Sequence, residues 1–452
     1  MRRGDDSDAH LGCVSEKRMK KYSMLQRSIA ENHIFLDMLR LHKGQDKETV
    51  GVETIRAALG ITRAKADANC DELVAANIVR RDGRRLSIDG DACYFLGVSV
   101  GSAHIRLVLL DLRFEPVSRQ DIEERFGISN QALMDIDKLG YSEENDPYSY
   151  AYDTFSAHDR DKGDFDFDIV RGKTAALVNL FLDRAEDERL PAFPLLGIGF
   201  AVAGPVDYEG KTWYSSPRIP AAKNVRLKDI IGYRNFERAQ KLGIFLSLDN
   251  NAKSSVISEY QHLQEQKFGR YTQDIALIYI GSGIGMAAVI GRKLLRGSRN
   301  FSGELGHVHL LLNDWKAGME ARSVEECVLK DAGEEAEEKD KDKGKGAYQR
   351  YIKFLPHVLN MVNCILGIDR FILLGHSVAM HGDLSSALME DRFKFTVEST
   401  QQYCERESGG RNTPSTAAIG AAIEAYFCLC FYLEGEDRVN LAQDISWSEP
   451  AE

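Results

Sequence analysis

The first 90 residues carry the apolar pattern of a small helical domain followed by a β-hairpin. Apolar side chains recur at helical spacing over residues 28–44, and two shorter helices are predicted over 52–59 and 63–77. Residues 60–62 form the turn between those two helices, and alternation about an Asp-Gly pair over 78–88 predicts the hairpin. This order of elements is that of a winged helix-turn-helix, in which the helix after the turn enters the DNA major groove.

The remainder of the chain alternates strands with helices. Strands are predicted over 94–110, 195–202, 243–248 and 274–280, and a helix is predicted over 172–185. Strands separated by helical segments are typical of an α/β body.

Three polar stretches lie outside this pattern. Residues 1–21 are polar with a basic cluster, which predicts a short arm. Residues 127–170 are acidic and contain aromatic residues, which predicts an insertion or a mobile loop. Residues 331–346 are nearly all charged or Gly, which predicts a solvated loop or a frayed helix without a role in the core.

Length and composition limit the class of protein. The chain has 452 residues, of which 43% are hydrophobic and 28% are charged. This is enough for about two to four domains. No apolar run is long enough to span a membrane, and the amino end lacks the apolar region of a secretory signal. The eight cysteines follow no disulfide spacing, so we expect reduced thiols in a cytoplasmic protein.

The net charge of −11 is unevenly distributed. Residues 1–90 hold 17 Lys and Arg against 14 Asp and Glu, whereas the rest of the chain holds 41 against 55. A basic amino-terminal segment on an acidic body indicates that this segment could bind phosphates. Chance variation between domains is the alternative explanation.

The candidate DNA contacts lie on the second helix of the turn and on the hairpin wing. Lys and Arg contact phosphates and release counterions, and Asn and Arg also read base edges. The candidates are Thr62, Arg63, Lys65 and Asn69 on the helix and Arg80, Arg81, Arg84 and Arg85 on the wing. Alanines dominate this helix, and Asp67 and Asp71 repel phosphate, so a helical dimerisation module with a solvated basic face is the alternative.

Several turns of the body carry small or chemically active residues. They are Gly97 to Ser102, Asp249-Asn250-Asn251, Gly281 to Gly285, and Phe301 to His307. Together with the segment 196–207, which ends in Gly-Pro-Val-Asp, and the helical segment 417–422, they resemble the ROK family (repressors, open reading frames and sugar kinases) over roughly residues 25–430. The resemblance implies a two-lobed, actin-like, sugar-kinase-type α/β body with a sugar site between the lobes. The winged helix resembles that of the repressor branch, which includes N-acetylglucosamine and xylose repressors.

The chain departs from the family's kinases at two places that the resemblance identifies. Their first strand turn reads Asp-x-Gly-Gly-Thr-Lys, whereas residues 99–104 read Ser-Val-Gly-Ser-Ala-His. Their sugar-contacting turn ends in an Asp that acts as general base, and the matching position here is Asn251. An amide does not accept a proton near pH 7, so this base is lost. Residues 374–377 also lack the Gly-Gly pair of the adenosine-side turn. We therefore expect no catalytic residue, no cofactor and no enzyme activity.

The residues that contact the sugar in the family match this chain better than those of the catalytic and phosphate-binding turns. Amides and carboxylates can donate to or accept from sugar hydroxyls. The residues that match the family's sugar contacts are Asn250, Asn251, Glu304, His307 and Glu325, with Glu326 as the one-residue alternative to Glu325. The resemblance implies a sugar or a sugar phosphate as effector. A structural hydrogen bond that closes the turn is the alternative role of Glu304 and His307.

No structural zinc is expected. Many family members hold zinc through the His of this motif and a Cys-rich run about ten residues further on. Here no Cys lies between His307 and Cys327, so a closed tetrahedral site is not formed. We expect no metal site elsewhere.

These observations predict a domain order and a function. We expect a winged helix over 22–90, a first lobe over 91–205 and 412–440, and a second lobe over 206–411. The predicted function is that of a sugar-responsive transcription regulator, a repressor rather than an activator, that binds a double-stranded DNA operator as a homodimer or a dimer of dimers and does not bind membranes. An active carbohydrate kinase and a protein-interaction member that does not bind DNA are the two alternatives.

Overall fold

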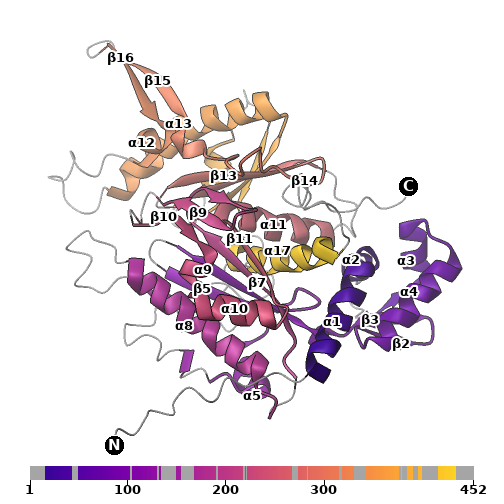
Figure 1. The fold of residues 1–452 in the computed structure, drawn as a ribbon. Coiled ribbons are helices and arrows are strands. Elements are labelled where there is room, and N and C mark those ends of the chain that lie inside the picture. The colour runs from indigo at the N-terminus through magenta and orange to yellow at the C-terminus, as the bar shows by residue number, and fades with distance from the viewer. Residues whose placement is uncertain are drawn as a thin grey trace, which may run out of the picture.

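The computed structural model comprises a helical head and a body built on two five-stranded sheets (Figure 1). The head comprises the described residues 16–42 and 49–88, and the body comprises the described residues from Tyr94 onwards. The described residues are 16–42, 49–101, 104–129, 132–133, 149–153, 167–189, 192–216, 219, 221–266, 273–281, 283–314, 318–329, 343–375, 378, 384–389, 395–399 and 416–433.

The head has the predicted winged helix-turn-helix arrangement. Its elements are α1 (Glu16–Glu31), α2 (His33–Leu41), β1 (Val50–Gly51), α3 (Val52–Leu59), α4 (Arg63–Ala75), β2 (Val79–Asp82) and β3 (Arg85–Ile88). Gly60 ends α3 with a φ of 62°, in the left-handed region that glycine adopts without strain. The Thr62 hydroxyl then caps α4 by accepting from the Lys65 backbone amide at 3.3 Å. The strands pair in the order β1-β3-β2.

The prediction of a polar arm over residues 1–21 is wrong from Glu16, where α1 begins. Tyr22 and Leu25 lie three residues apart and are buried, so this polar helix has an apolar stripe. The Tyr22 hydroxyl donates to the Phe193 carbonyl of the body at 3.1 Å. The first helix of the head is thus fastened to the body.

The first sheet has the strand order β11-β7-β4-β5-β6. Its strands are β4 (Tyr94–Val100), β5 (His104–Asp111), β6 (Ser149–Asp153), β7 (Leu195–Val202) and β11 (Phe245–Asn250). The helices whose apolar side chains pack on one face are α5 (Arg119–Phe126), α8 (Phe167–Glu186), α9 (Leu227–Ile230) and α10 (Tyr233–Lys241). A small sheet follows β7 and consists of β8 (Val206–Asp207), β9 (Thr212–Ser215) and β10 (Lys223–Arg226).

Two predicted boundaries in the body are wrong. The lobe boundary expected at residue 205 is contradicted by β11, which pairs in parallel with β7 inside the first sheet. The insertion expected over 127–170 contains β6, which extends the sheet beside β5, and the first residues of α8. Both corrections arise because strand pairing joins segments that are far apart in sequence. Most of the loop expected over 331–346 lies outside the described residues.

The second sheet has the order β14-β13-β12-β17-β18. Its strands are β12 (Ile275–Ile280), β13 (Ile284–Ile290), β14 (Lys293–Leu294), β17 (Arg370–Leu374) and β18 (Thr396–Ser399). The helices and the hairpin that accompany it are α12 (Val324–Leu329), α13 (Lys343–Leu366), α15 (Leu384–Ala387), β15 (His309–Asp314) and β16 (Gly318–Ser323). No described helix is both long and apolar enough to cross a bilayer.

Helices α11 (Asn251–Gln266) and α17 (Thr416–Leu433) lie between the two sheets, as Figure 1 shows. One buried apolar cluster joins both helices to Leu196 of the first sheet and Leu277 of the second. The approach of α17 to its neighbours is set by glycine. A Cβ atom would lie 1.7 Å from the Ala418 carbonyl oxygen if added to Gly97, and 1.6 Å from the Ser254 carbonyl oxygen if added to Gly420. Glycine is therefore required on both sides of α17.

Gly97→Ala is expected to destabilise the body by about 3 kcal/mol or more, because its new methyl group meets backbone that cannot move aside. The matched control is Gly172→Ala in the interior of α8, where nothing lies within 4 Å of the added Cβ. That change is expected to stabilise the protein by about 0.5–1 kcal/mol through helix propensity. Thermal unfolding compares the two, and a Gly97→Ala midpoint equal to that of the wild type would contradict the packing described.

Candidate functional sites

The candidate DNA contacts on α4 are confined to its first turn. Thr62, Arg63 and Lys65 are exposed. Asn69 is wrong as a DNA contact because only 8% of its surface is exposed. It lies three residues after the buried Ala66, on the side of α4 that packs into the head.

Two acidic residues of α4, Asp67 and Asp71, are paired with arginines. Asp71 lies 3.1 Å from Arg81 of the wing, and Asp67 lies 3.7 Å from Arg81 and 3.8 Å from Arg63. These pairs are solvent-exposed and contribute only about 0–1 kcal/mol each. They reduce the repulsion of phosphate that the two acids would otherwise exert.

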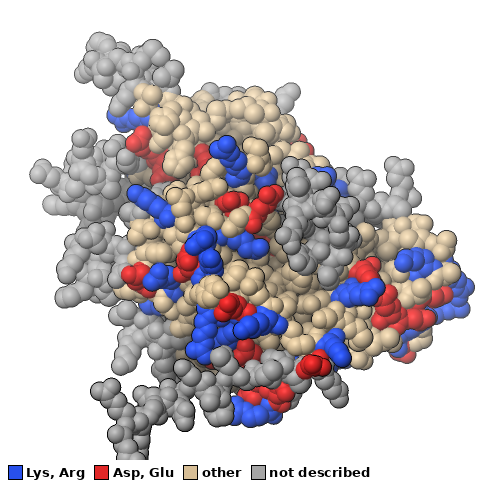
Figure 2. Space-filling view, viewed as in Figure 1, with Lys and Arg blue, Asp and Glu red and all other residues tan. Residues whose placement is uncertain are grey.

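The other wing arginines are exposed and differ in their partners. Arg80 binds Asp89 at 3.0 Å, and Arg85 donates to the Thr49 hydroxyl at 2.7 Å. The Arg84 side chain makes no hydrogen bond or ion pair with another described residue. Figure 2 shows blue and red side chains next to one another on the visible face of the head. The head is therefore a mixed surface, and Arg84 and Lys65 are the basic residues among the candidate DNA contacts whose side chains make no hydrogen bond or ion pair with a described residue.

Asn250 and Asn251 lie where β11 ends and α11 begins. The Asn250 amide makes two hydrogen bonds within the protein: Nδ2 donates to the Gly204 carbonyl at 2.9 Å, and Oδ1 accepts from the Ala252 backbone at 2.8 Å. The Asn251 side chain is half-buried and makes no hydrogen bond with another described residue. Of the two amides, Asn251 thus has the greater unused capacity to bind a ligand.

Glu304, His307 and Glu325 gather beside the second sheet. Glu304 Oε2 lies 3.8 Å from His307 Nε2. Glu325 comes from α12 and reaches Gly306, where an added Cβ would lie 2.9 Å from its Oε2. Burial raises the pKa of Glu304, and the charge of Glu325 acts in the same direction. The structure thus brings together three of the five predicted sugar contacts.

Lys253, which the sequence did not identify, connects this group to α11. Its side chain is buried, and Nζ donates to the carbonyl oxygens of Asn300 at 3.0 Å and Ser302 at 2.9 Å. Its charge opposes the burial that raises the pKa of Glu304. Lys253 therefore holds the loop that precedes Glu304 against the first turn of α11.

A buried ionic cluster lies directly behind Asn250. Arg296 contacts Asp249 through Nη1 and donates from Nη2 to Glu424 Oε1 at 2.7 Å, and all three side chains are at most 3% exposed. Asn300 Nδ2 donates to Asp249 Oδ1 at 2.8 Å, and the guanidinium lies 3.8 Å from the centre of the Tyr208 ring. These residues come from β11, the turn after β8, the loop after β14, and α17. No local sequence pattern identifies the cluster, since Arg296 lies 47 residues from Asp249 and 128 residues from Glu424.

The two carboxyls of this cluster differ in protonation. Burial raises the pKa of Glu424 well above its ordinary value, and the negative charge of Asp249 adds to the effect. Burial also opposes ionisation of Asp249, but Arg296 and Lys253 outweigh it and the pKa of Asp249 is lowered. The surroundings thus favour the ionised form of Asp249, beside Arg296, and the protonated form of Glu424.

Two of the positions at which the chain differs from the family's kinases lie among the described residues. Ser99 lies in β4, where it pairs with Ala201 of β7, and Asn251 opens α11. Ser102, Ala103, His376 and Ser377 lie outside the described residues. Within the described part of the chain, no group of three His, Cys, Asp or Glu side chains gathers as metal ligands do.

The body thus consists of two sheets with helices between them, and a winged helix precedes it. The family model described as the ROK family matches residues 177–425, more than half of the chain. The chain belongs to the ROK family.

Known proteins of this family include regulators and kinases. The crystal structure of a ROK family transcriptional regulator, a homologue of the E. coli MLC protein, superposes with a TM-score of 0.57 at 12% sequence identity, covering 90% of this chain and 99% of that one. The xylose repressor of Caldicellulosiruptor bescii is 31% identical over 144 residues, which are 30% of this chain and 33% of the repressor. The glucokinase of Streptomyces coelicolor is 26% identical over 138 residues, which are 30% of this chain and 39% of the kinase. The matches thus span between a third and two fifths of these curated relatives.

Removing the cation of the buried cluster is expected to cost far more than replacing its neutral acid. Arg296→Met removes the guanidinium that contacts the buried Asp249 and is expected to cost about 3–5 kcal/mol. Glu424→Gln keeps an acceptor for Arg296 and resembles the protonated acid, so a cost below about 1 kcal/mol is expected. Thermal unfolding at pH 7 measures both. An equal loss in the two variants would mean that Glu424 is ionised and the assignment is wrong.

Proposed function

We propose that the protein is a sugar-responsive DNA-binding transcription regulator, a repressor, whose sugar-kinase-like body binds a carbohydrate without phosphorylating it. The observation that carries this proposal is a winged helix fastened to a ROK body that has Asn251 at the general-base position. The regulator fold of the structural neighbour and the partial match to a xylose repressor support it.

The absence of catalysis rests on chemistry at two positions. Asn251 cannot take a proton from a sugar hydroxyl, and Ser99 stands where the kinases carry an acid. The rival, a carbohydrate kinase, requires ATP turnover with some hexose. A coupled ADP-release assay across a hexose panel tests it, and turnover above the no-sugar rate would overturn the inactive assignment.

DNA binding is assigned to the first turn of α4 and to the wing. Thr62, Arg63, Lys65 and Arg84 supply donors directly, whereas Arg80, Arg81 and Arg85 exchange weak surface partners for phosphates. Two-fold pairing of the chain would place two α4 helices on successive major-groove faces roughly 34 Å apart.

The sugar or sugar phosphate is assigned to Asn251, Glu304, His307 and Glu325, with Asn250 holding the turn beside them. Asn251 follows the first sheet, and the other three side chains lie beside the second. A ligand that contacts both sets joins the two lobes. It regulates DNA binding only if it binds one arrangement of the lobes better than another.

Helix α17 is the element that couples this ligand to the head. Glu424 of α17 binds the ionic cluster behind Asn250. Two residues later, the Tyr426 hydroxyl donates to Asp37 at 3.1 Å and accepts from Arg40 at 3.2 Å, and both of these residues belong to α2 of the head. A shift of α17 on ligand binding therefore reaches the head directly.

Lys65→Ala and Arg84→Ala are each expected to weaken binding to DNA from the gene's own upstream region, and to lower the salt dependence of the affinity by about one counterion. The matched control is Arg189→Ala in the body, whose side chain is 90% exposed. Fluorescence anisotropy at two salt concentrations measures the change. Affinities that move equally in all three variants would point to non-specific attraction, and no binding beyond a scrambled duplex would favour the protein-interaction alternative.

Tyr426→Phe is expected to reduce the sugar-induced change in DNA affinity several-fold. The variant keeps the aromatic ring but removes both hydrogen bonds to α2. Tyr22→Phe is the control, since it removes a bond between head and body that does not involve α17. DNA titrations with and without the sugar found by the panel give the coupling. Equal coupling in Tyr426→Phe and wild type would exclude α17 as the path.

A further inference from the structure

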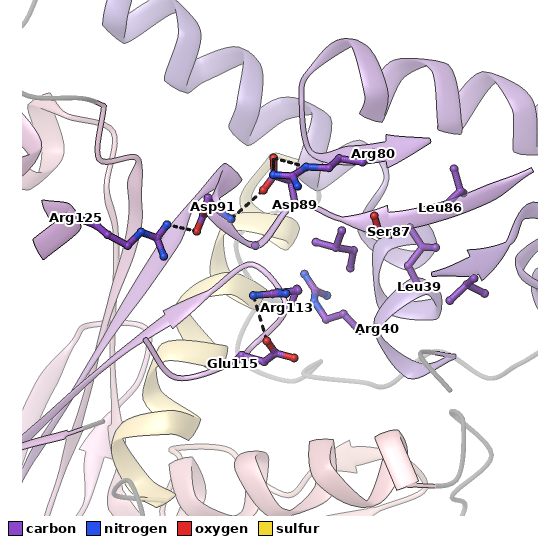
Figure 3. Close-up of a pocket in the computed structure, with 13 residues that line it drawn as sticks. Leu39, Arg40, Arg80, Leu86, Ser87, Asp89, Asp91, Arg113, Glu115 and Arg125 are labelled. Carbon is purple, nitrogen blue, oxygen red and sulfur yellow. Dashed lines mark hydrogen bonds and ion pairs between the residues drawn. The ribbon is translucent and has the colours of Figure 1, made fainter. Parts of the chain in front are cut away.

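A cavity of about 270 Å³ lies between the head and the body (Figure 3). Residues of α2, β1, β2 and β3 form its head side, and α5 and the turn after β5 form its body side. Residues 89–91, which connect the head to the body, line it as well. None of the candidate sugar residues lines it, and of the candidate DNA contacts only Arg80 does, so it is distinct from the sugar site and shares one residue with the DNA-binding surface.

Four guanidinium groups reach this cavity, Arg40 and Arg80 from the head and Arg113 and Arg125 from the body. The Arg40 side chain is 1% exposed, and its Nη2 has no hydrogen-bond partner among the described residues. Its Nε donates to the Leu112 carbonyl at 2.8 Å, which fixes the plane of the group. A buried donor without an acceptor is costly, and a bound acceptor removes that cost.

The carboxylates that line the cavity are already held by arginines, as the dashed lines in Figure 3 show. The pairs are Asp89 with Arg80 at 3.0 Å, Asp91 with Arg125 at 2.5 Å, and Glu115 with Arg113 at 3.2 Å. Arg113 also binds Asp111 at 2.8 Å, and Arg40 contacts Asp37. Each guanidinium has five N–H donors, and even with these partners Arg40 Nη2 and Arg113 Nη1 make no hydrogen bond with a described residue. The unused hydrogen-bonding capacity of the cavity is therefore donor capacity on cations.

We propose that this cavity binds a small phosphate-bearing anion between Arg40 and Arg113. The planar forks of two arginines match the oxygens of a phosphate group. The volume lies below the range of about 300–1,000 Å³ that holds drug-sized ligands, so it suits a compact anion.

The bound anion would join the head to the body next to the connection between them. That connection already lies tight against the body, since a Cβ added to Gly90 would lie 2.2 Å from Asp111 Oδ2, and the Leu112 backbone amide donates to the Gly90 carbonyl at 3.2 Å. A ligand held by Arg40 of the head and Arg113 of the body would limit rotation at this point. The anion thus stabilises one orientation of the head, whether or not a sugar is bound.

Isothermal titration of the whole protein with inorganic phosphate, at an ionic strength held constant with chloride, tests the proposal. Glycerol 2-phosphate is the second ligand. Binding of both shows that the site recognises the phosphate group itself, and binding of the ester alone assigns a phosphate monoester. Either result supports the proposal, and no saturable heat with either ligand overturns it.

Two variants locate the binding. Arg113→Gln is expected to weaken it about tenfold or more, the loss of one charge-assisted contact, and Arg189→Gln is expected to leave it unchanged. Ser87→Met fills the cavity without altering charge and is expected to block binding even if Arg113→Gln disturbs the fold. Phosphate should also raise the unfolding midpoint of the wild type but not of Ser87→Met. Wild-type affinity in both Arg113→Gln and Ser87→Met would place the anion elsewhere and reject the site.

Discussion

The backbone of α17 lies so close to its neighbours that no side chain fits between them, and the arrangement of both lobes depends on this contact. Gly97 and Gly199 admit the helix to the first sheet, and Gly420 admits it to α11. At this distance the space between the backbones does not accommodate even a single additional methyl group. The helix therefore cannot tilt or slide without moving what it touches. It is a rigid element between two sheets that are otherwise joined through α11.

This rigidity gives the polar groups of α17 their significance. Glu424 and Tyr426 are fully buried in a helix that is otherwise almost entirely apolar, and each binds a guanidinium, Arg296 or Arg40. A buried charged group is costly and adds little net stability compared with an apolar replacement. These two contacts instead fix the position of neighbouring elements, because each guanidinium binds its partner in a defined geometry. One fixes the end of β11 next to Asn251, and the other fixes α2 of the head.

The sequence was sufficient where the determinants are local. Gly60, Thr62 and the Asp82-Gly83 turn define the winged helix within a few residues, and the Gly-rich turns identify the family. It was insufficient where the determinants are distant. The strand β6 is recognised only beside β5, and β11 belongs to the first sheet only because it pairs with β7.

The same reason explains the errors at the candidate sites. Asn69 has the chemistry of a base-reading residue, but the face of α4 that it occupies is decided by how the head packs. Lys253 and Arg296 lie in segments without any motif, and their partners come from other elements of the body. Residue types therefore indicated which functional groups are present. Burial and pairing decided which of these groups are accessible to a ligand.

The candidate sugar-binding residues are divided between the two lobes. This division connects the loss of the general base at position 251 with the proposed role as a regulator. Asn251 follows the first sheet, whereas Glu304, His307 and Glu325 accompany the second, and Lys253 holds the loop of Glu304 against α11. In a kinase, part of the energy of binding such a ligand is used to reach the transition state. In the proposed regulator, with an amide at position 251, the same contacts would instead serve to favour one arrangement of the lobes. Because α17 lies between the lobes and bonds to α2, the head is placed to respond to that arrangement.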